Sequence, residues 1–195
     1  MARLPFPLKD ITADYGEMSA FRKARGMQAH SGTDFAPAGS SRGRTKIKSV
    51  GAGTIKLIQW SDILGWVIVQ TVWDVKKKKA IYVGYSHISC NNHGMNCKGP
   101  KVHGDHAPVN KKVGSRVKEG QTMAYMGNTG SGSNGVHLHL TLSRTLKGVF
   151  GATASKMDIV PWVATQVVPK VVKPKVVKPA PKPVIECCPC CKRPL

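Results

Sequence analysis

The sequence lacks any apolar run of the length that a membrane span or a secretion signal needs. Its first sixteen residues, MARLPFPLKDITADYG, mix prolines and charges with short apolar groups, whereas a signal peptide has a continuous apolar centre. A membrane span would need roughly eighteen apolar residues in a row. We therefore expect no signal peptide and no membrane span, and a protein that accumulates in the cytoplasm where it is made.

Sustained helical periodicity is also missing. Apolar and polar residues instead alternate in strand-like runs that are separated by glycine turns, at 45–60, 65–75, 80–89, 121–126 and 136–143. This pattern predicts a mainly β, antiparallel architecture, and 195 residues leave room for one compact domain with appendages. Four lysines, 76–79, stand between the second and third runs and predict an exposed hairpin tip.

Two short motifs contain residues that bind metals. His30 and Asp34 are four residues apart in HSGTD, and His137 and His139 follow about a hundred residues later in GVHLHL. Imidazole nitrogen and carboxylate oxygen are ligands that zinc accepts, and three protein ligands with an open fourth position are typical of a catalytic site. The two motifs together offer one candidate ligand more than such a site needs.

Strand geometry allows the two motifs to form one site. In VHLHLTL the leucines alternate with His137 and His139, so an extended strand would direct both imidazoles to the same face. A fully extended 30–34 segment would hold the Cα atoms of His30 and Asp34 roughly 13 Å apart, which is too far to share one ion. Gly32 offers the bend that would bring them together.

The order of motifs along the chain resembles a known family. From about Tyr15 to Ser143 the sequence runs through HSGTDFAPAG, KSVGAGTIKLI, GYSHIS and VGSRVKEGQTMAYMGNTGSGSNGVHLHLTL. In this respect it is similar to the lysostaphin-like zinc metalloendopeptidases, which cut peptidoglycan peptides. The resemblance implies a compact antiparallel β-sheet domain of that metallopeptidase type, and a zinc-dependent endopeptidase that acts on the cross-links or stem peptides of bacterial peptidoglycan.

The resemblance also implies roles for five residues. His30, Asp34 and His139 would bind zinc, and His87 and His137 would be a catalytic pair beside the metal. One of the pair would transfer protons and the other would stabilise the oxyanion, and the sequence leaves open which does which. Without the resemblance, His87 would be interpreted as a polar residue at the end of a strand.

The glycine-rich stretch Gly127–Gly135 does not fit a phosphate-binding loop, because it lacks the lysine and the following helix that such loops need. Two interpretations remain. It is either a flexible rim of small residues beside the substrate groove or an ordinary turn between strands.

Acidic residues are scarce, with 10 Asp and Glu against 30 Lys and Arg, and the formal net charge is +20. Residues 166–195 contribute 7 − 1 = +6 and the rest 23 − 9 = +14, so both parts are basic. Such charge suits the anionic polymers of the bacterial cell wall. Nucleic acid is the less favoured partner, because no recognition helix or interleaved aromatic pattern accompanies the charge.

Three functions are compatible with these features of the sequence. The first is a peptidoglycan endopeptidase without an export signal, which is typical of a phage endolysin that waits in the host cytoplasm until a separate pore-forming protein releases it. The alternatives are a basic zinc-containing protein that binds nucleic acid, and a wall-binding module that has lost catalysis. The presence of all five metal and catalytic positions argues against the last. The sequence does not show whether a direct diaminopimelate link or an interpeptide bridge is cut.

The composition changes abruptly after Trp162. The repeat VVPKVVKPKVVKPAPKPV has too little apolar surface to fold and predicts an extended polyproline-type linker. We therefore divide the chain into a catalytic domain at 1–165, a linker at 166–185 and a cysteine-rich end at 186–195.

Cysteines and histidines in two further segments could bind a second metal. One segment is the end of the chain, ECCPCCKRPL, and the other is an insertion at about 90–112. The candidate ligands are Cys90, His93, Cys97, His103, His106, Cys187, Cys188, Cys190 and Cys191. Alternatively, Cys90 and Cys97 form a disulfide outside the cell, the rest of the insertion is a polar loop, and the terminal thiols stay reduced.

Overall fold

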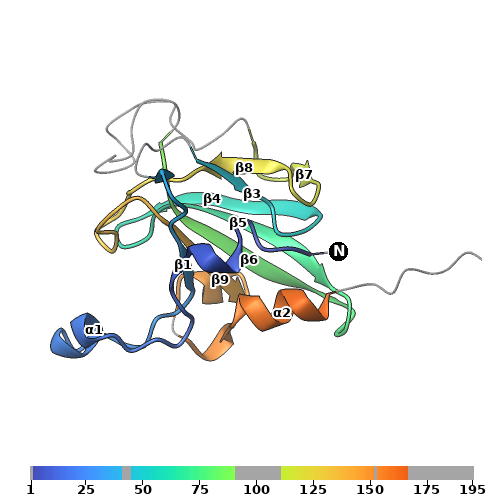
Figure 1. Cartoon of the computed structure of the whole chain (residues 1–195). Coiled ribbons are helices and arrows are strands. Elements are labelled where there is room, and N and C mark those ends of the chain that lie inside the picture. Colours follow the sequence, from blue (N-terminus) through green and yellow to red (C-terminus); the bar gives the residue numbers. More distant parts are fainter. Residues whose placement is uncertain (1, 41–44, 91–110, 152, 167–195) are drawn as a thin grey trace, which may run out of the picture.

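The computed structural model of the chain describes residues 2–40, 45–90, 111–151 and 153–166 (Figure 1). These residues form one large antiparallel sheet in the order β1-β2-β9-β6-β5-β4-β7, with β10 also paired to β9, and a two-stranded sheet of β3 and β8. The mainly β, antiparallel fold predicted from the alternating pattern is confirmed. Among the described residues, no helix is long and apolar enough to cross a membrane.

The strands are short at the start of the domain and long in its centre. They are β1 (Ile11–Ala13), β2 (Thr33–Phe35), β3 (Lys46–Lys48), β4 (Gly53–Ser61), β5 (Gly65–Asp74), β6 (Lys79–Ile88), β7 (Arg116–Val117), β8 (Thr122–Tyr125), β9 (Leu138–Ser143) and β10 (Lys156–Met157). The helices are α1 (Ala20–Ala24) and α2 (Ile159–Thr165), with single 3-10 turns at Leu8–Asp10, Lys147–Val149 and Thr153–Ser155.

The predicted strand at 45–60 is in fact two strands in different sheets. β3 pairs with β8, and β4 pairs with β5 and β7. The chain turns between them at 49–52, where Ser49 Oγ donates to the Gly51 carbonyl at 2.6 Å. The predicted lysine hairpin is confirmed, since Asp74 pairs with Lys79 and residues 75–80 are exposed.

The two short helices were not predicted, because five and seven residues are too few to show a periodic pattern. Asp158 is the N-cap residue of α2, and its side chain accepts from the Val160 N–H at 2.9 Å. Trp162 packs into the core and donates its indole N–H to Asp74 at 3.1 Å. Gln166, the last described residue, is 1% exposed and accepts from the Val75 N–H at 2.8 Å.

The main core lies on one face of the large sheet. Ile68 of β5, Tyr85 of β6 and Leu140 of β9 point into it, and β3, β8 and α2 pack over it. The intervening residues point to the opposite face, where Val67, Val69 and Val149 form a second, smaller cluster. Because directly paired residues share a face, the pairing of Ser86 with His139 places His139 on this second face.

Candidate metal centre and catalytic cleft

Three potential ligand atoms converge where β2 pairs with β9. Asp34 lies directly opposite His139 in the ladder, so their side chains project together. His139 Nδ1 is 2.8 Å from Asp34 Oδ1 and 3.0 Å from His30 Nε2, and His30 Nε2 is 3.2 Å from Asp34 Oδ1. The structure thus brings together the three residues that the sequence resemblance implied as ligands.

The tautomer of His30 follows from its surroundings. His30 Nδ1 lies 3.0 Å from the Asp14 carbonyl, which can only accept, so this nitrogen carries the hydrogen and Nε2 presents a lone pair to the site. The lone pair of Nε2 and the Asp34 carboxylate therefore face the same point as His139 Nδ1. Without a cation, the hydrogen on His139 Nδ1 is the only one that can bond to either His30 Nε2 or Asp34 Oδ1.

A zinc ion suits this donor set. Tetrahedral ligands with bonds of about 2.0–2.1 Å lie about 3.3–3.4 Å apart, and the three separations here are 2.8, 3.0 and 3.2 Å. Small outward movements would therefore admit the ion. Among the described residues, this is the cluster of histidine, cysteine and acidic side chains that could hold a metal.

Gly32 lets the His139 ring approach the backbone closely. A Cβ atom at Gly32 would lie 2.7 Å from both Cε1 and Nε2 of His139, and 2.7 Å from the Leu140 carbonyl oxygen. Gly32 is not among the glycines with a positive φ, so glycine is needed here for space. His139 Nε2 is buried without a hydrogen-bond partner in the described part of the chain.

His87 reaches the site through a local break in strand alternation. Tyr85 points into the core, so regular alternation would also send His87 there, away from His139. Instead the register of β5 and β6 shifts by one residue in this region, and His87 has a positive φ of 58°. This bulge turns the His87 ring to within 5.9 Å of the His139 ring and 4.6 Å of the His137 ring, measured between centroids.

The glycine-rich loop holds both His87 and His137 in the same tautomer. His87 Nδ1 donates to the Thr129 carbonyl at 2.7 Å, and His137 Nδ1 donates to the Gly135 carbonyl at 2.8 Å. Each ring therefore keeps a lone pair on Nε2, and the Nε2 of His137 lies 3.8 Å from Asp34 Oδ2. His139 differs from His137, because its Nδ1 is the atom that faces the ligand cluster.

Burial disfavours protonation of His87 and His139. It lowers the pKa of His87 to about 3, with help from His137 and His139 nearby, and it also lowers the pKa of His139. Burial alone would raise the pKa of Asp34, but the hydrogen bond from His139 and the nearby His30 imidazole outweigh it and hold that pKa well below its ordinary value. At neutral pH the site therefore has an ionised carboxylate and neutral imidazoles at His87 and His139.

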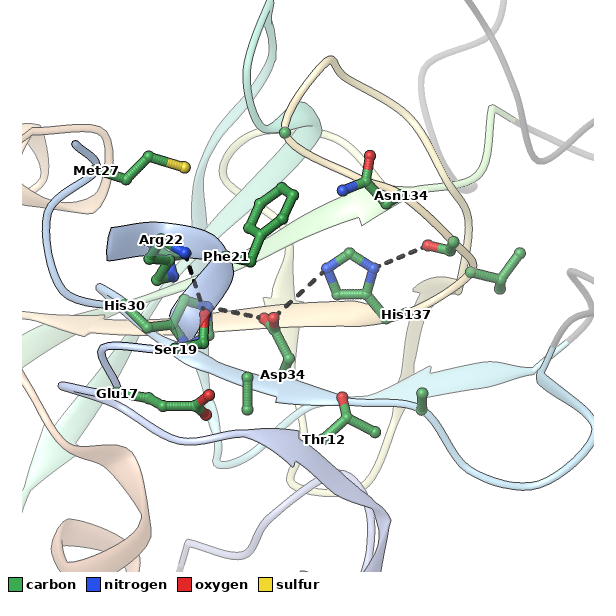
Figure 2. Close-up of a pocket in the computed structure, with 15 residues that line it drawn as sticks. Thr12, Glu17, Ser19, Phe21, Arg22, Met27, His30, Asp34, Asn134 and His137 are labelled. Carbon is green, nitrogen blue, oxygen red and sulfur yellow. Dashed lines mark hydrogen bonds and ion pairs between the residues drawn. The ribbon is translucent and has the colours of Figure 1, made fainter. Parts of the chain in front are cut away.

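Part of this site lines an open cleft (Figure 2). It is lined by His30, Asp34 and His137, and by Gly132, Asn134 and Gly135 of the glycine-rich loop. Phe21, Arg22 and Met27, from α1 and the segment that follows it, also line it. Sequence patterns did not identify these three residues, because five helical residues leave no periodic signal.

A buried lysine supports the metal-binding segment from behind. Lys156 is 8% exposed, and its Nζ donates to Ser31 Oγ at 2.9 Å, next to His30. Tyr15 donates its hydroxyl to the Lys156 carbonyl at 3.4 Å. Burial lowers the pKa of Lys156. The contact between Lys156 and Ser31 could not be predicted from the sequence, because Lys156 belongs to β10, which is only two residues long.

Of the residues predicted to bind a second metal, the described part of the chain contains Cys90. Cys90 is 1% exposed and disulfide-bonded. The remaining candidates lie outside the described residues, as does the linker beyond Gln166. They are His93, Cys97, His103, His106, Cys187, Cys188, Cys190 and Cys191.

Solved structures with the same architecture are peptidases. The catalytic domain of the antimicrobial peptidase lysostaphin from Staphylococcus simulans matches with a TM-score of 0.54 and 22% identity, over 79% of this chain and 91% of that one. A mutant of the catalytic domain of the prophage-encoded M23 protein EnpA from Enterococcus faecalis matches with a TM-score of 0.52 and 22% identity, over 80% of this chain and 93% of that domain. The chain has the lysostaphin-like fold.

A third structure with this lysostaphin-like fold is a zinc-containing peptidase from Vibrio cholerae, with a TM-score of 0.51 and 20% identity. The match covers 86% of this chain but 40% of the Vibrio protein, so the shared part is less than half of that protein. No family model matches the sequence.

Proposed function

We propose that this protein is a zinc-dependent endopeptidase that hydrolyses peptide bonds of bacterial peptidoglycan. The observation that carries the proposal is the convergence of His30 Nε2, Asp34 Oδ1 and His139 Nδ1 within 4.8 Å of one another, with two further imidazoles at their side. The lysostaphin-like fold supports it, since the matched proteins are described as peptidases.

His30, Asp34 and His139 would hold the zinc ion. When bound, zinc supplies a Lewis acid that polarises the scissile carbonyl and lowers the pKa of the attacking water to about 7. The carbonyls of Asp14, Thr129 and Gly135 fix the rings around it, because each accepts the Nδ1 hydrogen of one histidine. This arrangement orients the side chains before the substrate arrives.

His137 and His87 would divide the proton chemistry. His137 lines the cleft, and its Nε2, which keeps a lone pair, lies 3.8 Å from Asp34 Oδ2 at the ligand cluster. His137 would therefore take the proton of the attacking water and return it to the leaving amine as the C–N bond breaks. His87, whose pKa is lowered to about 3, stays neutral and would accept a hydrogen bond from the water through Nε2, which orients the attack.

Metal removal and restoration test this function. Full-length protein treated with a strong chelator should lose its activity on purified peptidoglycan and regain it with substoichiometric zinc. Mass analysis of the released fragments would identify the bond that is cut. Full activity in a preparation shown to be metal-free would contradict the mechanism.

We further propose that the enzyme lyses a bacterial host from within, as a phage endolysin does. Support comes from the basic charge of +20, which suits anionic wall polymers, and from the match to a prophage-encoded protein. Expression in a bacterium should leave cells intact until a separate pore-forming protein is co-expressed. Lysis without that second protein would contradict this role.

A further inference from the structure

We infer that Phe21 and Met27 form an apolar wall of the cleft that recognises an alkyl side chain next to the scissile bond. The inference rests on the proposed function and extends it to the class of substrate. The favoured substrate is then a direct cross-link or stem peptide that contains a long-chain diamino acid, rather than an interpeptide bridge made only of glycine.

The first observation is that these side chains are exposed although they are large and apolar. Phe21 is 46% exposed and Met27 is 42% exposed, and neither belongs to the core clusters. Helix α1 has no buried residue and projects away from the sheet (Figure 1). The fold therefore does not need the apolar character of Phe21 or Met27, and a ligand is the remaining explanation that their position favours.

Their position is the second observation. Phe21 and Met27 line the same cleft as His30, Asp34 and His137, and Figure 2 shows the Phe21 side chain directed over the space beside Asp34. A substrate held with its scissile bond at the metal-ligand cluster would pass along this wall. Exposed apolar groups beside catalytic side chains are typical of ligand-binding surfaces.

Local bonds hold the wall in place relative to the metal ligands. Ser19 Oγ caps α1, and Arg22 donates from Nη1 to the Gln28 carbonyl at 2.8 Å. The His30 N–H donates to the Glu17 carbonyl at 2.9 Å, which ties the base of the segment to a ligand residue. The guanidinium of Arg25 lies 4.0 Å from the centre of the Phe21 ring. Hydrogen bonds within the segment from Glu17 to His30 therefore hold its shape, and the bond at His30 attaches it to the metal-ligand cluster.

The apolar wall differs in chemistry from the glycine-rich loop that also lines the cleft, and this difference favours one substrate class. In the loop, Gly132, Asn134 and Gly135 offer backbone and one polar side chain. A glycine bridge has no side chain to place against Phe21 and Met27. The alkyl chain of a diaminopimelate or lysine residue would remove apolar surface on both partners from water, which improves binding. One methylene in an apolar pocket changes kcat/KM by roughly 10- to 200-fold.

The test compares two soluble substrates of similar length with the zinc-loaded full chain. One has D-alanine joined directly to diaminopimelate, and the other has D-alanine followed by five glycines. We expect kcat/KM to be at least roughly tenfold higher for the alkyl substrate. The double variant Phe21→Ser, Met27→Ser should remove most of that preference, mainly through KM, because kcat/KM should fall much more for the alkyl substrate than for the glycine substrate.

Leu8→Ser is the matched control, because Leu8 is 59% exposed and does not line the cleft. It should leave both substrates unaffected, and zinc content and melting temperature should be unchanged in all variants. Equal kcat/KM for the two substrates, a preference for glycine, or an equal loss on both in the double variant would overturn the inference alone. If the zinc-loaded wild type cleaves neither these substrates nor whole peptidoglycan, the proposed function fails, and the inference fails with it.

Discussion

Replacing Gly32 by alanine should weaken zinc binding although Gly32 offers no ligand. The new Cβ would lie 2.7 Å from the His139 ring, and an ordinary contact begins at 3.4 Å, so the ring must move by about 3.4 − 2.7 = 0.7 Å. The backbone oxygen of Leu140 blocks the Cβ at the same distance, so β2 must also move away from β9. Both displacements separate Asp34 from His139.

The size of the effect follows from how narrowly zinc tolerates its ligands. Ligand distances vary by about 0.2 Å, which is well under the required 0.7 Å. We expect affinity to fall by about a hundredfold or more, which equals about 2.7 kcal/mol at about 1.36 kcal/mol per factor of ten. Overpacking should also lower the stability of the metal-free protein, by about 1–3 kcal/mol.

Competition with a chelator of known affinity measures the loss, at a temperature well below the melting point of the metal-free variant. Gly135→Ala is the control, because Gly135 also lines the cleft but its Cβ would meet nothing within 4 Å. That variant should bind zinc like the wild type. A folded Gly32→Ala protein with wild-type zinc affinity would refute the reasoning, because the His139 ring would then have room that the structure does not give it.

Three further predictions concern individual groups. His139→Ala should lose both zinc and wall lysis, whereas His137→Ala should keep its zinc and lose roughly a hundredfold or more in turnover; metal mass spectrometry beside a lysis assay checks this, and a zinc-replete His139→Ala would reverse the assignment. Because burial lowers the pKa of His87 to about 3, the unfolded chain binds a proton there between about pH 6.5 and 3 that the folded chain does not, so the metal-free protein should lose stability as pH falls through this window. His87→Asn, which tolerates the positive φ, should reduce that slope by up to about 1.4 kcal/mol per pH unit in urea titrations, and an unchanged slope would exclude His87 as its source. Truncation after Gln166, which keeps its bond to Val75, should weaken binding to intact walls most at low salt and spare cleavage of a small peptide; equal loss on both substrates would assign the tail to the catalytic fold.

Much of the sheet could be predicted from the sequence because alternation is a local property. The runs that became β5, β6, β8 and β9 alternate clearly, and the lysines between β5 and β6 mark their hairpin. The division of residues 45–60 into β3 and β4 was not predicted, because it depends on which partner strands are available. Nothing local to that run specifies pairing with β8.

The site shows the same limit. Alternation in VHLHLTL indicated that His137 and His139 lie on one face, and the spacing in HSGTD allowed His30 to meet Asp34. His87 is different, since regular alternation would direct it into the core, and only the bulge and its positive φ bring its ring beside those of His137 and His139. The backbone there is set by tertiary pairing with β5 and by the bond to Thr129, which lies 42 residues away.

The two loop carbonyls that orient His87 and His137 belong to one short stretch of chain. Thr129 and Gly135 are 135 − 129 = 6 residues apart. Thr129 is fixed at one end, where its Oγ1 donates to the Ile88 carbonyl at 2.8 Å and accepts from the Trp66 N–H at 3.1 Å. The length of this stretch therefore helps to set the distance between the imidazoles of His87 and His137. A loop grafted in from another protein would have to preserve that spacing, whereas the α1 segment, which also lines the cleft, can be exchanged without changing it.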